Sequence, residues 1–142
     1  MTRKPLFLAA LLMLGLVLAA CAAGTERGVV SLAPVSDLPP DMQEAPQRVR
    51  TVYQFAVANP AALENVPCYC GCGAIGHHSN LACFVKEIGP DGKPVFDDHA
   101  MGCSICVDIA QDVMRMTAEG REPAAIRADI VATYSKFGPS NQ

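Results

Sequence analysis

The chain has 142 residues, eleven of them basic and fourteen acidic, and a formal net charge of −3 at pH 7. This length is typical of a single domain. The acidic balance argues against nucleic acid and anionic lipid surfaces as binding partners.

The first twenty residues have the pattern of an export signal. Arg3 and Lys4 form a positive start, an apolar run covers residues 6–18, and the small residues of "LAAC" end at Cys21. A cysteine in this place resembles a lipobox, in which the chain is cut before the cysteine and its thiol is lipidated. We expect residues 1–20 to be a lipoprotein signal peptide. Acyl chains such as palmitate on Cys21 would then anchor the protein to the extracytoplasmic face of the cell membrane.

An ordinary signal or a membrane helix is the alternative interpretation of this start. The apolar run is shorter than the roughly 20 residues that span a bilayer, which favours the lipoprotein signal. Cleavage would remove two of the eleven basic residues, Arg3 and Lys4, and leave a net charge of −5 on the mature chain. Nucleic acid is therefore not an expected partner.

Residues 21–46 predict the lipidated cysteine followed by a flexible tether. This stretch contains four prolines and no helical period of apolar residues. The folded domain is expected over residues 47–138. At about ninety residues it is of a size at which metals or disulfides often assist folding.

The domain is predicted to be mainly α, a small unit of about three helices with a cysteine-rich loop. Apolar spacing predicts helices over residues 47–58 and 104–118 and a third from Pro123 to about Phe137, and Gly120 suits the end of the second. The short "EGREP" between the last two predicts an antiparallel helical hairpin. The faces expected in the core are Val49, Val52, Tyr53, Ala56 and Val57, then Ile105, Ile109, Val113 and Met116, then Ile126, Ile130, Tyr134 and Phe137.

Two shorter elements complete the predicted domain. Asn59-Pro60 suits a stop followed by a short new turn. The stretch "EIGPDGKPVF" predicts a small loop or hairpin around residues 91–92.

Cysteines carry the strongest chemical signal. Apart from Cys21 there are six, and an even count in an exported chain is typical of three disulfides. Cysteines separated by one residue fit disulfide geometry badly, so each of the first three would need a partner among the last three. The six are Cys68, Cys70, Cys72, Cys83, Cys103 and Cys106.

The same cysteine spacing also fits a metal site, in which several thiols converge on one ion. In an extended stretch, Cys68, Cys70 and Cys72 would point to one side, while Cys103 and Cys106 would share a face at a helix start. A helix N-terminus also stabilises thiolate charge. Three histidines complete the set of expected ligands, although each has the alternative of an exposed loop or capping position: His77, His78 and His99.

The softness of these ligands indicates the ion. Thiolates select copper(I), zinc and iron–sulfur clusters, and an oxidising location disfavours iron–sulfur. Zinc uses four ligands, often as two CxxC pairs, and only Cys103/Cys106 forms one here. Six thiols suit a copper(I)–thiolate site of more than one ion. We therefore expect copper(I), with zinc second. Val107 excludes c-type haem, because that attachment motif needs a histidine there.

The segments "PCYCGCG", "GHHSNLACFV", "DDHAMGCSIC" and "VDIA" resemble the bacterial lipoprotein family named for its PCYCGC motif, over about residues 59–134. This resemblance implies a membrane-anchored exported protein and no particular activity. The helical stretch after Cys106 also looks like the hairpin of the cytochrome c maturation thiol oxidoreductases. Their CxxCQ continuation is missing here, so this likeness concerns architecture alone.

Three functions remain open from the sequence. The first is a lipoprotein without catalytic turnover that sequesters a soft ion or exchanges it with a delivery or acceptor protein. The second is a thiol–disulfide oxidoreductase with Cys103 as nucleophile and Cys106 as resolving thiol. The third is a binding module stabilised by disulfides, without metal.

Overall fold

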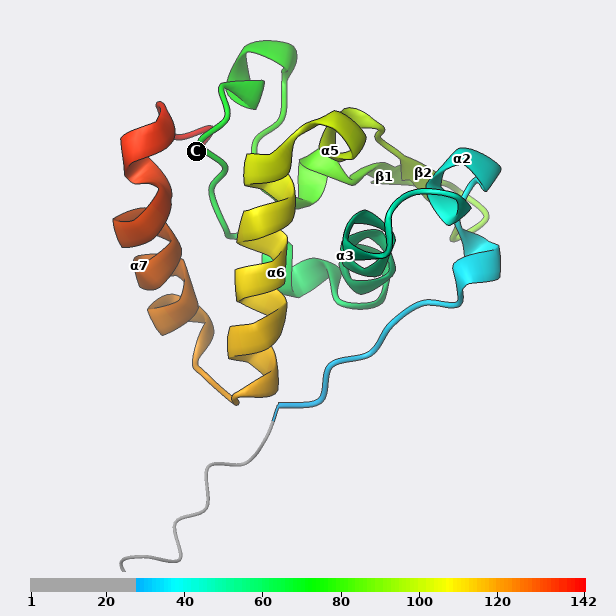
Figure 1. The fold of residues 1–142 in the computed structure, drawn as a ribbon, viewed down its shortest axis with the longest axis horizontal. Coiled ribbons are helices and arrows are strands. Elements are labelled where there is room, and N and C mark those ends of the chain that lie inside the picture. Colours follow the sequence, from blue (N-terminus) through cyan, green and yellow to red (C-terminus); the bar gives the residue numbers. More distant parts are fainter. Residues whose placement is uncertain (1–27) are drawn as a thin grey trace, which may run out of the picture.

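The computed structural model describes residues 28–142, and the expected signal and Cys21 lie outside them. The described part is mainly helical with one small two-stranded sheet, which confirms the predicted fold class (Figure 1). Within these residues, no helix combines the length and apolar character that crossing a membrane requires.

Helix α3, Gln47–Ala58, has the predicted bounds and packs one face into the core. Pro46 precedes its first turn, where a missing N–H costs nothing. Its buried face carries Phe55 beside the expected Val52, Tyr53 and Ala56, whereas Val49 and Val57, which were expected in the core, are only partly buried. Helix α3 ends at its C-cap Asn59, and a short helix, α4, Pro60–Glu64, begins directly after it.

The predicted helical hairpin is confirmed. Helix α6, Ser104–Ala118, and helix α7, Pro123–Tyr134, lie side by side and contact each other (Figure 1). Gly120 has φ 72°, and the next N–H, of Arg121, bonds back to the Met116 carbonyl, so glycine closes the helix in the left-handed conformation it tolerates best.

The prediction for the end of the hairpin was partly wrong. Helix α7 stops at Tyr134 and continues as the 3₁₀ turn Ser135–Phe137, which rotates the side chain that follows away from the helix stripe. Phe137, expected in the core, is therefore 54% exposed.

The predicted hairpin around residues 91–92 is present. Strands β1, Val85–Ile88, and β2, Pro94–Phe96, pair antiparallel. Their base packs against α3, where the Phe84 and Tyr53 rings meet edge to face at 5.1 Å. The residues after the hairpin, Asp97 and the short helix α5, His99–Gly102, therefore lie next to the loop that carries Cys68, Cys70 and Cys72. This loop is called here the cysteine loop.

Part of the expected tether belongs to the folded body. Val30 already packs against the core and Ser31 accepts a hydrogen bond from the Asn59 side chain, and the short helix α2, Pro40–Gln43, follows in the same stretch. Leu38 and Met42 are each 3% exposed. Prolines break the helical period but leave apolar side chains free to pack, so the described residues from Val30 to Pro46 belong to the folded body rather than to a tether.

The domain also extends past the expected end at residue 138. The last residues return over the cysteine loop, and the C-terminus lies beside it in Figure 1. Asn141 is buried, and its backbone N–H donates to the Cys68 carbonyl at 3.1 Å. The C-terminal tail is thus part of the fold around the cysteines.

Candidate metal centre

The cysteine loop turns sharply twice at glycines. Gly71 has φ 85° and Gly76 has φ 89°, the left-handed region that other residues enter at a cost. Between them lies the 3₁₀ turn Cys72–Ile75. The thiols of Cys68, Cys70 and Cys72 converge as predicted, with sulfurs within 4.8 Å of one another, but a turn at Gly71 rather than a continuous extended strand brings them together.

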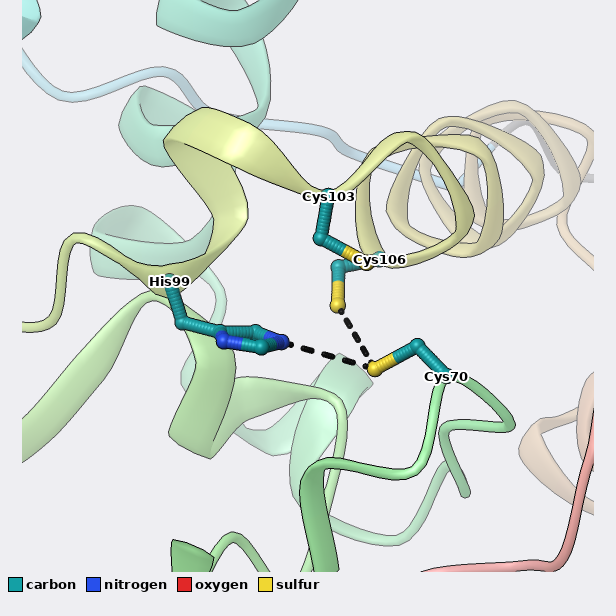
Figure 2. A group of neighbouring side chains, drawn as sticks. All are labelled: Cys70, His99, Cys103 and Cys106. Atoms are coloured by element: carbon teal, nitrogen blue, oxygen red, sulfur yellow. Dashed lines mark hydrogen bonds between the residues drawn. The ribbon is translucent and has the colours of Figure 1, made fainter.

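One set of ligands, called here the outer group, consists of Cys70, His99, Cys103 and Cys106. Their ligand atoms lie within 4.8 Å of one another (Figure 2). The Cys70 Sγ is 3.5 Å from the His99 Nε2 and 3.5 Å from the Cys106 Sγ. Cys103 is the N-cap of α6 and Cys106 lies in its first turn, so both residues stand at the N-terminal end of this helix.

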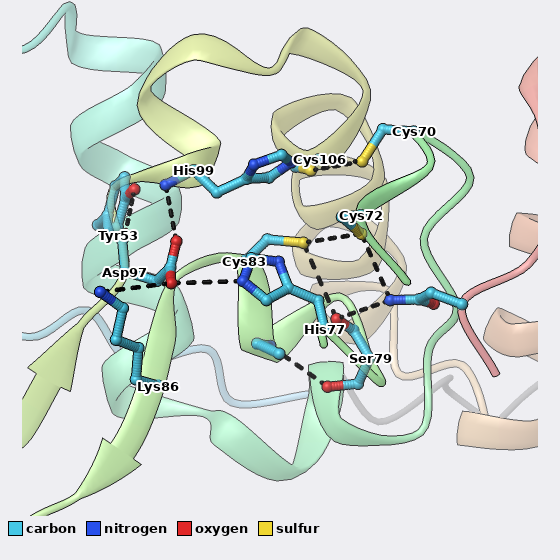
Figure 3. A network of polar contacts seen from close by, with 12 residues as sticks. Tyr53, Cys70, Cys72, His77, Ser79, Cys83, Lys86, Asp97, His99 and Cys106 are labelled. Atoms are coloured by element: carbon cyan, nitrogen blue, oxygen red, sulfur yellow. Dashed lines mark hydrogen bonds and ion pairs between the residues drawn. The ribbon is translucent and has the colours of Figure 1, made fainter. Parts of the chain in front are cut away.

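A second set, called here the inner group, consists of Cys72, His77 and Cys83. All three residues are buried, and the Cys72 and Cys83 sulfurs are 3.6 Å apart (Figure 3). His99 also lies within 4.8 Å of this group, so its ring sits between the two sets. The His77 and His99 rings meet edge to face at 5.1 Å.

Cys68 joins the two groups. Its Sγ is 3.5 Å from the Cys70 Sγ and 3.4 Å from the Cys106 Sγ, and with the 3.5 Å Cys70–Cys106 separation these sulfurs form a nearly equilateral triangle. Cys68 also forms a three-sulfur group with Cys83 and Cys106. The centre of such a triangle lies about 2.0 Å from each corner, a few tenths short of the roughly 2.3 Å of a zinc–thiolate bond. A small outward shift would therefore admit an ion.

His77 is prepared as a ligand by its neighbour Asp97. The His77 Nε2 lies 3.3 Å from a carboxylate oxygen of Asp97, which also pairs with Lys86 at 3.7 Å (Figure 3). A ring nitrogen that faces a carboxylate carries the proton, which leaves the other nitrogen as an acceptor. That other atom, Nδ1, is buried and has no hydrogen-bond partner among the described residues. An unpartnered buried lone pair beside two thiols fits a metal ligand.

The clustered thiols shift one another's pKa values. Hydrogen bonds from Cys106 and then Cys83 lower the pKa of Cys68 to about 2. The same bond to Cys68 raises the pKa of Cys106, and burial raises the pKa of Cys70. A soft cation would bind these sulfurs by displacing the protons of the thiols whose pKa is raised.

The structure brings together eight of the nine expected ligands. His78 is the exception, because its side chain is exposed and belongs to none of the groups of potential ligands in the described chain. Adjacent residues in a loop point apart, so His77 enters the centre and His78 faces solvent. The eight that gather are Cys68, Cys70, Cys72, Cys83, Cys103, Cys106, His77 and His99.

Sequence reasoning missed two supporting residues. Asp97 accepts the backbone N–H of His99 at 2.8 Å and also contacts the His77 ring at 3.3 Å. The Asn141 side chain accepts the Cys68 N–H at 2.7 Å and donates to the Cys72 Sγ at 3.5 Å. Nothing in the local sequence signals either contact, since each partner lies far along the chain.

Comparison with known proteins gives one match. The model of a family described as a protein of unknown function with PCYCGC motif matches residues 11–140. Neither a curated protein nor a solved structure matches the chain.

Proposed function

The chain belongs to the PCYCGC family, and we propose that this member is a membrane-anchored lipoprotein that binds copper(I) through its clustered thiolates outside the cytoplasm. The observation that carries the proposal is the convergence of six cysteine sulfurs and two histidine nitrogens in one cluster of overlapping groups. Its role is to sequester the ion or exchange it with a delivery or acceptor protein, without catalytic turnover.

The arrangement of the sulfurs favours a metal over disulfides. A disulfide joins two sulfurs about 2.05 Å apart and leaves each with no third partner. Here Cys68, Cys70 and Cys106 contact one another in a triangle, and the six cysteines of the described chain are free. A triangle is a pattern that one ion satisfies and pairwise bridges do not.

The ligand types favour a soft ion. The groups of potential ligands in the described chain contain thiols and imidazoles and no carboxylate, which suits copper(I) and zinc rather than magnesium or calcium. The outer group alone offers three sulfurs and one nitrogen, a set that zinc also accepts. Six thiols exceed the four ligands of a single zinc ion, and this excess supports copper(I).

The oxidoreductase alternative receives less support from the geometry. It needs Cys106 to resolve a bond formed at Cys103, whereas the Cys106 sulfur contacts Cys68 and Cys70 at 3.4 and 3.5 Å. A resolving thiol engaged in a sulfur cluster is poorly placed for exchange with a protein disulfide.

Elemental analysis of the full chain tests the proposal. The protein is purified from the membrane fraction in detergent without reducing agent, and its metal content and free thiols are counted. We expect at least one equivalent of copper, lost when Cys68, Cys70 and Cys72 are replaced by Ser and retained in the control His78→Ala. Zinc in place of copper would correct the ion. No metal and no free thiols would overturn the proposal in favour of the disulfide module.

The anchor is tested separately. Cys21→Ser should move the protein from the membrane fraction to the soluble fraction, because the acyl chains supply the membrane affinity. If the variant stays in the membrane fraction, the lipid anchor is wrong, whatever the metal content.

A further inference from the structure

We infer that the centre holds two soft ions in two unlike positions, and that exchange with a thiol-bearing partner takes place at the outer position alone. This inference rests on the proposed metal-binding function and adds to it the number of ions and the route by which they leave.

The number of ligands and their division support two ions. The outer group and the inner group share no cysteine, and only His99 of the outer group lies within 4.8 Å of the inner group, so no single ion reaches every donor of both. Soft ions in proteins use up to four ligands, and eight gather here. Cys68 lies in one sulfur group with Cys70 and Cys72 and in another with Cys83 and Cys106, which places it as the bridging thiolate between the two positions.

The two positions differ in access to solvent. Cys68, Cys83 and Cys106 are fully buried and Cys72 is 2% exposed, while Cys70 and Cys103 are the two partly exposed cysteines of the six. An ion held by the inner group would therefore have no cysteine ligand that an external thiol can replace. An ion in the outer position has two.

A cavity lies beside the outer position. It has a volume of about 220 Å³, and Cys103, Met101 and Arg48 are among its lining residues. Met101, whose thioether is a soft donor, lines the same cavity. A partner thiol would enter here, lose its proton as its sulfur bonds the ion, and release Cys103, which takes up a proton. Copper stays in the +1 state throughout.

Exchange therefore has an order. The outer ion leaves first, and the inner ion can follow only by moving past Cys68 into the vacated outer position. Retention and release are thereby divided between two positions of one cluster.

The experiment measures both stoichiometry and release. The detergent-purified full chain is loaded with copper(I) without oxygen, its ions are counted by native mass spectrometry, and copper is withdrawn with excess glutathione while a colorimetric copper(I) chelator records the release. We expect two ions, the first withdrawn at least about tenfold faster than the second. Cys103→Ser and Cys70→Ser should lose the fast ion. Cys83→Ser and His77→Ala should lose the slow one, and the control His78→Ala should keep both.

The outcomes separate this inference from the proposed function. A single bound ion would overturn the two positions and leave metal binding intact, whereas no bound ion would overturn both. Two ions withdrawn at one rate would overturn the order of exchange. Circular dichroism of each apo-variant shows whether it folds. Each position is tested by two variants, so a single unfolded variant still leaves one test of that position.

Discussion

The Nε2 atom of His77 lies 3.3 Å from the carboxylate of Asp97, and the same carboxylate accepts the backbone N–H of His99. One buried acid thus orients one imidazole and holds the start of the helix that carries the other. Carboxylates of this kind fix the tautomer and angle of metal-binding histidines.

Replacing Asp97 by Asn should weaken metal binding about 10- to 100-fold. An amide both donates and accepts, so it no longer holds the proton on the Nε2 of His77. Competition with a chelator of known affinity measures the loss. The exposed neighbour provides the control, Asp98→Asn, which should bind as the native protein does. An equal loss in both variants would contradict the assigned role.

Replacing Asn141 by Ala should lower the free energy of unfolding by about 1–3 kcal/mol, because the buried Cys68 N–H loses its acceptor. Urea denaturation of the apoprotein measures this. Ser140→Ala removes an exposed hydroxyl and should change little. If Asn141→Ala unfolds at the same urea concentration as this control, the tail does not stabilise the cysteine loop.

Replacing Gly71 by Ala should destabilise the fold by about 1–2 kcal/mol, the strain of a left-handed backbone with a side chain. A Cβ at Gly71 meets no atom within 4 Å, so strain rather than a clash would be measured. Gly102 is equally free of neighbours but lacks the positive φ, which makes Gly102→Ala the matched control. Thermal unfolding compares the two, and equal midpoints would show that the turn at Gly71 is not required.

Metal affinity should rise with pH. The pKa values of Cys70 and Cys106 are raised, so these thiols are protonated near neutral pH and must each release a proton to bind the ion. Each proton released strengthens binding about tenfold per pH unit. Chelator competition at pH 6 and pH 8 measures the slope. An affinity that does not change over this range would show that the ion does not displace these protons.

Much of the helical framework is encoded in short stretches of sequence. The bounds of α3 and α6 follow from apolar spacing together with Pro46 before the first and Gly120 after the second. These signals act over one or two turns, and so they can be recognised without knowledge of the fold. The prediction for Phe137 failed because a switch from α-helix to 3₁₀ turn changes the period within three residues.

The donor types and their close spacing were equally evident in the sequence, since CxC and CxxC place thiols near one another whatever the rest of the chain does. The division of the donors was decided by tertiary structure. Packing of the β hairpin against α3 places the Asp97 carboxylate beside the His77 ring. The C-terminal tail places the Asn141 side chain beside the Cys68 N–H, 73 residues away in the chain. Packing also buried Leu38 and Met42 in a stretch whose prolines indicated a tether. Contacts between distant segments depend on how the helices and the hairpin pack together, and a local pattern of residues does not predict that packing.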